Sequence, residues 1–262
     1  NGDMITLYDN GMHIPILWSH LIPATLEGKA MHNVQNAMFA VAMAYSFEVD
    51  LDNIRHGLRT FDSSFFEAPG RTNVFDEHPF RVILDYAHNP AAFRAMADLV
   101  SRLEVSGKRI TVVSVPGDRR DEDVIEATRI LAGHFDHYIC KADDNRRRRG
   151  PDEIPTMLRD GLIEQGVAEA AISLISDEVE AVDFALSMAE EGDLLLVFGD
   201  DSARCWKQII YFNHEDRPEP EINLAPSNTE AACFEDILGD GDVLIRDERG
   251  VRLAKNQAED AD

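Results

Sequence analysis

The sequence predicts an α/β protein with a mostly parallel sheet, and three observations support this prediction. Short apolar runs rich in β-branched residues alternate with amphipathic stretches between about residues 80 and 212, which is the pattern of strands joined by crossover helices. The alternation repeats five times, enough for a complete three-layer domain. An apolar fraction of 44% in 262 residues is ordinary for a chain that buries a globular core.

The five strand and helix pairs follow one another along the chain. RVILDY at 81–86 is the first strand, and the helix expected at 91–104 has its apolar residues at helical spacing. The last strand is DLLLVFGD at 193–200, an apolar run typical of a fully buried strand. A short helix through Trp206 follows this strand. The three units between them are RITVVSV with a helix at about 121–133, HYIC with a helix at about 152–165, and AAISLI with a helix at about 178–190.

A smaller unit precedes this region. Asn10-Gly11 lies between two apolar runs and predicts a β-hairpin, and helices are expected at about 30–45 and 51–60. A hairpin and two helices bury little core of their own, so we expect residues 1–68 to be the last part of a preceding domain. Pro69-Gly70 marks the hinge into the α/β domain, expected at 69–212.

The last segment, 213–262, predicts a linker and a small hairpin. HEDRPEPE is rich in proline and acidic residues, a composition that does not form a packed core. DVLIRDERGVRLA alternates apolar and polar residues on both sides of a turn at 248–250.

Charge and cysteine content restrict the partners. The chain has 49 acidic and 25 basic residues and a formal net charge of −24, which disfavours nucleic acid and anionic membranes as partners. Cys140, Cys205 and Cys233 have no metal-binding or redox spacing and are expected to be free thiols in a reducing cytoplasm. No apolar run is long enough to span a membrane, and the start at Asn1 indicates a cut piece of a longer chain.

Three strand ends are unusually polar, and strand ends are where a doubly wound sheet binds ligands. DYAHNP follows the first strand, PGDRRDED the second and CKADDNRRRRG the third. We expect adjacent strand ends to bring their carboxylates, guanidinium groups and a histidine to one edge of the sheet. Each segment also has a plain interpretation, namely a turn with a helix cap, a surface salt-bridge cluster and a solvated loop, respectively.

Two common nucleotide-binding signatures are absent from the sequence. No Gly-x-Gly-x-x-Gly follows a strand. Gly107-Lys108 is followed by Arg109, and Arg102 stands where a P-loop needs its first glycine. The chain therefore has no P-loop of its own.

Four stretches in order, EGKAMHNVQNAMFAVAMA, APGRTN, ILDYAHNP and PGDRRDED, resemble the Mur ligase superfamily, whose members join an amino acid to a carboxylate using ATP. Within it, VPGDRRDED, VFGDDSARCWKQIIYF and IRDERGVRLA resemble the cyanophycin synthetase family. The resemblance implies the end of the central ATPase domain followed by the Rossmann-like C-terminal domain. It also implies ATP bound between these domains, Mg²⁺ ligands and a P-loop in the upstream part, and a cytoplasmic homo-oligomer when full length.

The same resemblance implies roles for individual residues. His32, Asn33 and Asn36 match a segment that lies beside the nucleotide base, and the two carboxamides fall on one helical face. The other matches are Arg71 as the interdomain arginine, Asp85 at the ribose hydroxyls, His88 facing the reacting phosphate as a catalytic residue with Asp85, and Arg119 as a nucleotide contact.

The loop Asp143, Asp144, Asn145, Arg147 matches the amino-acid-binding loop of ligases that add diaminopimelate, with Arg146 replacing proline. The resemblance implies that Arg147 binds the α-carboxylate of the incoming amino acid and that Asp143 or Asp144 binds a cationic side chain. Its implied substrates are ATP, arginine and the aspartate side chains of a polyaspartate (cyanophycin) chain, joined through an acyl phosphate. Arg148 and Arg149 are interpreted as solvated loop.

Two alternatives stay open at this point. The chain could belong to another Mur-type ligase, of the peptidoglycan or folylpolyglutamate kind, although the paired acidic residues at 143–144 do not suit glutamate addition. It could also be a non-catalytic remnant that binds a nucleotide or a partner protein, because no P-loop is present to complete an ATP site.

Overall fold

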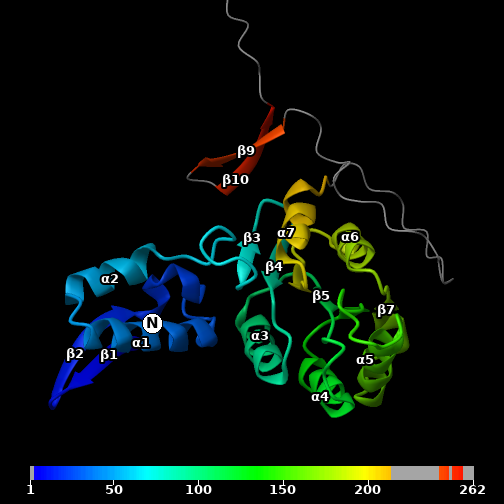
Figure 1. The fold of residues 1–262 in the computed structure, drawn as a ribbon, viewed down its shortest axis with the longest axis horizontal. Helices are drawn as coiled ribbons and strands as arrows, with labels where there is room; N and C mark the ends of the chain where they lie inside the picture. Colours follow the sequence, from blue (N-terminus) through cyan, green and yellow to red (C-terminus); the bar gives the residue numbers. More distant parts are fainter. Residues whose placement is uncertain (1–2, 214–241, 248–249, 256–262) are drawn as a thin grey trace, which may run out of the picture. The chain divides into compact units, whose positions relative to one another are not determined.

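The computed structural model describes residues 3–213, 242–247 and 250–255 (Figure 1). The chain divides into two units, Asn1–Pro218 and Glu219–Asp262, and each is described by itself. The first unit contains the predicted hairpin, the predicted helices and all five strand and helix pairs. The second contains β9 (Asp242–Asp247) and β10 (Gly250–Lys255), which pair antiparallel as the predicted terminal hairpin. The acidic segment 214–221 lies outside the described residues.

The α/β domain has a six-stranded sheet in the order β3-β4-β8-β5-β6-β7. All neighbours among the last five strands pair parallel, whereas β3 pairs antiparallel with β4. Strand β3 was not predicted from the sequence, because three residues are too few for a periodic pattern. The strands are β3 (Asn73–Phe75), β4 (Arg81–Asp85), β5 (Arg109–Val113), β6 (His137–Cys140), β7 (Ile172–Leu174) and β8 (Leu194–Phe198).

Helices cover both faces of this sheet (Figure 1). On one face α3, α4 and α5 pack in a row and share a core with side chains such as Ile83 and Leu196. On the other, α6 and α7 share a second core with Val112 and Val197. Asn89 starts α3 by accepting a hydrogen bond from the Ala92 amide, as the predicted helix cap requires. The helices are α3 (Pro90–Arg102), α4 (Asp121–Leu131), α5 (Glu153–Glu164), α6 (Glu178–Met188) and α7 (Ser202–Tyr211).

The last strand, β8, is inserted between β4 and β5. The chain moves outward through β5, β6 and β7 and then returns on the opposite face of the sheet through α6. The end of β8 therefore separates the end of β4 from the end of β5, so the three polar strand ends are not consecutive neighbours. The segment after β8, Gly199–Ser202, lies at the centre of the edge that binds ligands in this class of sheet.

The N-terminal part has its own small core. The hairpin of β1 (Met4–Asp9) and β2 (Met12–Trp18) turns at Asn10-Gly11, where both residues have positive φ angles of 47° and 80°, as the predicted tight turn needs. The helices α1 (Met31–Ser46) and α2 (Leu51–Thr60) pack against the hairpin in a third core. Two short 3-10 turns, Ser19–Leu21 and Pro23–Thr25, connect β2 to α1.

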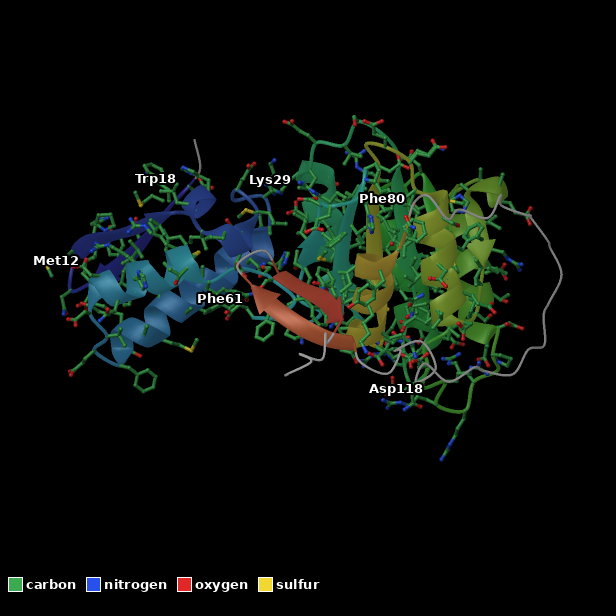
Figure 2. All side chains as sticks on the ribbon, turned by 90° about the horizontal axis from the view of Figure 1, so that it is seen from above. Met12, Trp18, Lys29, Phe61, Phe80 and Asp118 are labelled. Atoms are coloured by element: carbon green, nitrogen blue, oxygen red, sulfur yellow. The ribbon has the colours of Figure 1, made fainter. Side chains whose placement is uncertain are left out.

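Side chains distinguish the two ends of the sheet. Figure 2 shows Phe80, just before β4, and Asp118, just after β5, at opposite ends of the strands. Within the described part of the chain, no helix is long and apolar enough to cross a membrane. Cys140 and Cys205 are buried free thiols, as predicted, and Cys233 lies outside the described residues.

Two helical glycines test how tightly the helices pack. A Cβ added at Gly161 in α5 would lie 2.6 Å from Thr128 Oγ1 of α4, whereas one added at Gly57 in α2 meets no atom within 4 Å. We expect Gly161→Ala to lower the free energy of unfolding by about 1–3 kcal/mol through overpacking, and Gly57→Ala to raise it by about 1 kcal/mol through helix propensity. Urea unfolding of both variants measures this, and equal gains would contradict the tight α4–α5 contact.

Candidate active site

The residues predicted for the site gather around two cavities. The larger cavity, about 910 Å³, is lined by parts of α1, α2, α3 and the end of β4. The second cavity, about 540 Å³, is lined by the segments after β4, β5, β6 and β8, and we call it the acidic cavity. The predicted residues divide between them: His32, Asn33, Asn36, Arg71 and Asp85 line the larger cavity, and His88, Arg119, Asp143, Asp144, Asn145 and Arg147 line the acidic cavity.

Asp85 and His32 meet in the larger cavity through Thr72. Asp85 Oδ2 accepts hydrogen bonds from the Thr72 amide (2.8 Å) and hydroxyl (3.1 Å), and the same hydroxyl lies 3.1 Å from His32 Nε2. Burial raises the pKa of Asp85 in spite of these bonds and lowers the pKa of His32 in spite of the nearby carboxylate. His32 Nδ1 is buried and has no hydrogen-bond partner among the described residues.

The other predicted residues of this cavity are partly engaged. Asn33 donates to the Ala24 carbonyl at 2.7 Å, and Asn36 donates to the Asn33 carboxamide oxygen at 3.2 Å. The two carboxamides are thus on one face of α1, as predicted. The Arg71 guanidinium lies 5.9 Å from the centre of the Tyr86 ring, within the range of a cation–π contact.

The segment after β4 contributes residues to both cavities. Asp85 lines the larger cavity, while Tyr86 and His88 line the acidic cavity. His88 Nδ1 lies 2.9 Å from the Tyr86 carbonyl oxygen, which orients the ring. The two residues predicted to be catalytic therefore lie three positions apart and face different cavities.

The acidic cavity has an excess of negative charge. Its lining includes five aspartates and two arginines, Arg119 and Arg147. Three carboxylates have a basic partner: Asp118 pairs with Arg147 at 2.8 Å, Asp144 with Arg204 at 2.6 Å, and Asp200 with Lys141 at 2.7 Å.

The remaining two aspartates accept hydrogen bonds only from backbone amides. Asp143 bonds the amide of Asn145, and Asp201 bonds the first amides of α7. Among the described residues, no basic side chain forms an ion pair with either of them. The structure thus distinguishes the two acidic residues of the loop, because Asp144 is occupied by Arg204 whereas Asp143 has no basic partner.

The arginine-rich loop adopts a constrained backbone. Arg147 and Arg148 have positive φ angles of 48° and 80°, a conformation that side chains with a Cβ rarely adopt. The loop also packs closely on the turn after β5, because a Cβ added at Gly117 would lie 2.2 Å from the Arg146 carbonyl oxygen. A glycine at 117 is therefore needed for this contact.

Arg149 is not solvated, contrary to the sequence interpretation. Its guanidinium donates to the carbonyl oxygens of Gly117 (3.0 Å) and Arg119 (2.7 Å) and forms ion pairs with Asp121 and Glu153, both at 2.7 Å. A run of four arginines could not reveal which one folds back onto the turn after β5. Arg148 is exposed, as expected.

Arg119 and Arg120 differ in their surroundings. Arg120 forms an ion pair with Asp123 at 2.9 Å, which is the plain interpretation of this segment. Arg119 Nε is buried and has no hydrogen-bond partner in the described part of the chain, and the Arg119 side chain lines the acidic cavity instead of the larger one. Of the two, Arg119 is the residue available to an anionic group of a ligand.

A buried ionic network that the sequence did not predict lies beneath this cavity. Lys141, Glu178 and Asp200 are connected by ion pairs of 2.7–2.9 Å, and Arg204 also contacts Glu178. Lys141 and Glu178 have fully buried side chains. A charged residue directly after a buried strand was the available signal for Lys141, whereas Glu178 was indistinguishable from other acidic residues at helix starts.

A doubly wound sheet with polar groups and cavities at the carboxyl ends of its strands is a ligand-binding domain. The chain belongs to the Mur ligase family: the family described as "Mur ligase, glutamate ligase domain" matches residues 70–200. This range contains the whole acidic cavity apart from Asp201 and Ser202.

Several relatives are called cyanophycin synthetases. That of Crocosphaera subtropica is 35% identical over 210 residues, which are 77% of this chain and 24% of the relative. That of Synechocystis is 39% identical over 189 residues, which are 72% of this chain and 21% of the relative. This chain spans about a quarter of the length of these curated relatives. A diaminopimelate ligase of Corynebacterium efficiens is 31% identical over 68% of this chain and 33% of its own length.

Solved structures show the same fold. A folylpolyglutamate synthase of Mycobacterium tuberculosis complexed with ADP and AMPPCP has a TM-score of 0.53 and 21% identity, covering 71% of this chain and 41% of its own. Escherichia coli FolC in complex with ADP has a TM-score of 0.52 and 24% identity, covering 67% and 38%.

The donor side chains do not gather into a metal-binding group in the described part of the chain. Within the described ranges, no three or more His, Cys, Asp or Glu side chains form a group that could hold a metal ion. The Mg²⁺ ligands implied by the resemblance were assigned to a preceding segment, and that assignment stays a prediction.

The Gly117 contact predicts a loop that opens when the turn beneath it is altered. Gly117→Ala places a methyl group against the Arg146 backbone, which must move, whereas a Cβ at Gly150, at the other end of the loop, would meet nothing closer than 3.9 Å. We expect trypsin to cleave at Arg146–Arg149 at least about tenfold faster in Gly117→Ala, as a displaced loop populates open forms. Gly150→Ala should be cleaved like the parent chain, and equal cleavage of all three would contradict the contact.

Proposed function

We propose that this chain is the C-terminal part of an ATP-dependent amide ligase that adds arginine to the aspartate side chains of a polyaspartate chain. The observation that supports arginine most directly is the acidic cavity, where the carboxylates of Asp143 and Asp201 have no basic partner among the residues that the structure describes. A guanidinium donates hydrogen bonds in a planar fork that matches carboxylates. The names of the relatives, cyanophycin synthetases, support the same assignment.

Arg147 is the proposed partner of the α-carboxylate of arginine. Its guanidinium is half-exposed at the cavity and pairs with Asp118, which is also exposed. An exposed ion pair contributes little to stability, so the α-carboxylate can replace Asp118 at small cost. This leaves Asp143 as the proposed partner of the substrate side chain, in preference to Asp144, and Asn145 as a neighbouring polar contact.

The larger cavity is the proposed ATP site. It contains the unpartnered His32 Nδ1, the carboxamides of Asn33 and Asn36, the Arg71 guanidinium and the Asp85 carboxylate, a set of donors and acceptors that suits a base and ribose. Mg²⁺ and a P-loop are proposed to come from a preceding segment of the ligase. Exposed apolar residues on α1 and directly after it, including Phe39 and Phe47, support the assignment of residues 1–68 to a larger ATPase domain.

The proposed reaction has two steps. An aspartate carboxylate of the polymer attacks the γ-phosphorus of ATP and releases ADP, which forms an acyl phosphate. The α-amine of arginine then attacks the acyl carbon, and phosphate leaves as the amide bond forms. His88 and Arg119 are the proposed partners of the phosphate oxygens, because both line the acidic cavity and His88 belongs to the segment after β4 that contributes residues to both cavities.

Other Mur-type ligases are the second candidate. The folylpolyglutamate synthases share the fold, but a glutamate side chain would meet the carboxylates of Asp143 and Asp201 without a cation between them. A non-catalytic remnant that binds only a nucleotide or a partner protein is the remaining alternative, and it predicts no amino-acid-dependent phosphate release.

The test uses the full-length ligase with ATP, a polyaspartate primer and each amino acid in turn, measuring phosphate release. We expect release with arginine, and Asp143→Asn and Arg147→Ala should each raise KM for arginine by about 10–100-fold, as expected for loss of a charged hydrogen bond. Arg102→Gln removes a surface ion pair with Asp98 on α3 and serves as the matched control, with KM unchanged.

Two outcomes would refute the assignment. Release that depends on another amino acid would exclude arginine as the substrate, and release that depends on none would exclude the ligase. Unchanged arginine KM in both Asp143→Asn and Arg147→Ala would show that the amino acid binds elsewhere.

A further inference from the structure

The buried Lys141 ammonium lies beneath the acidic cavity. Lys141 directly follows β6 and is completely buried. Its Nζ lies 2.7 Å from Asp200 Oδ2, 2.9 Å from Glu178 Oε1 and 3.1 Å from Ser114 Oγ. An ammonium has three donors, so these three acceptors satisfy it fully. They come from the segments that follow β8 and β5 and from the start of α6.

Glu178 uses both carboxylate oxygens to hold the segment after β8. Its oxygens accept the amides of Asp200 (2.7 Å) and Asp201 (3.3 Å) in addition to the Lys141 ammonium. Burial acts to raise the pKa of Glu178, but Lys141, the Asp200 amide and Arg204 lower it to about 2. Glu178 is therefore ionised and can hold both bases.

Arg204 connects this buried network to the amino-acid loop. One nitrogen, Nη2, contacts both Glu178 Oε2 and, at 2.6 Å, Asp144 Oδ2. The Asp144 amide also donates to Asp200 Oδ2 at 3.3 Å. Asp144 is thus fixed by its side chain and its backbone, at the point where the loop leaves β6.

A stabilising role alone does not account for such a network. Buried ion pairs lose about as much in desolvation as they gain in attraction, and apolar replacements are often as stable. The network ends on a loop that lines the acidic cavity, and its Arg204 neutralises Asp144, one of the two acidic residues of that loop. Both features indicate that the network acts on the loop.

We propose that Lys141, Glu178 and Arg204 are positioning residues that fix the loop Asp143–Arg147 and so determine amino-acid affinity and selectivity. By neutralising Asp144, Arg204 leaves Asp143 as the loop carboxylate that faces the substrate side chain. Lys141 and Glu178 hold Arg204 and the end of β8 in place. The identity of the amino acid in this inference rests on the proposed function. The dependence of the loop on the network is independent of that function.

The double contact of Arg204 Nη2 allows a rescue experiment. A lysine at 204 has one ammonium that can contact Glu178 and Asp144 together, whereas glutamine has no charge to hold them. In the full-length ligase we expect Arg204→Gln to raise KM for arginine by about tenfold or more while KM for ATP stays within about twofold. Arg204→Lys should recover most of the arginine affinity.

Hydrogen exchange tests the loop independently of any substrate. The amides at 143–149 should exchange faster in Arg204→Gln than in the parent chain and return toward parental rates in Arg204→Lys, with Arg102→Gln as the control. Unchanged exchange in Arg204→Gln would overturn the inference, whatever the substrate. Equal rises in KM for arginine and ATP would also overturn it, since a general loss of structure affects both. Failure of the proposed function would instead appear as no arginine-dependent release in the parent ligase.

Discussion

The site depends on a lysine ammonium buried at the end of a central strand. Lys141 gathers acceptors from three other segments, and these segments converge because β8 lies between β4 and β5. A buried charge needs several well-placed partners, so the ends of β5, β6 and β8 and the start of α6 have one favourable arrangement. This arrangement also determines the positions of the residues that line the acidic cavity above these strand ends.

The two cavities have different chemistry, which suits a reaction with two small substrates. The larger cavity holds neutral amides, a histidine, the Arg71 guanidinium and one carboxylate–threonine pair, whereas the acidic cavity has more carboxylates than guanidinium groups. The segment Asp85–His88 lies between them and contributes to both. In the proposed reaction one carboxyl group first receives the phosphoryl group and is then attacked by the amine, so both substrates have to reach this shared boundary.

Local patterns in the sequence predicted the five strand and helix pairs, the Asn10-Gly11 hairpin and the polar strand ends, and the structure confirms them. The pattern could not give the strand order, because insertion of β8 depends on packing across the whole sheet. The pattern did predict that the polar segments lie at one edge of the sheet. It could not reveal the Lys141 network, because the members of this network come from four separate segments. The hydrogen bond from Arg149 to the Gly117 carbonyl oxygen is also a long-range contact, so local sequence patterns could not predict it.

The claim that the acidic cavity selects a positively charged side chain can be measured directly. Citrulline has the shape of arginine without its charge, so calorimetric titration of the protein with each isolates the contribution of charge. Arginine is predicted to bind at least about tenfold more tightly than citrulline, the effect of a charged hydrogen bond to an unpaired carboxylate. Equal affinity for the two, or tighter binding of glutamate, would contradict the account.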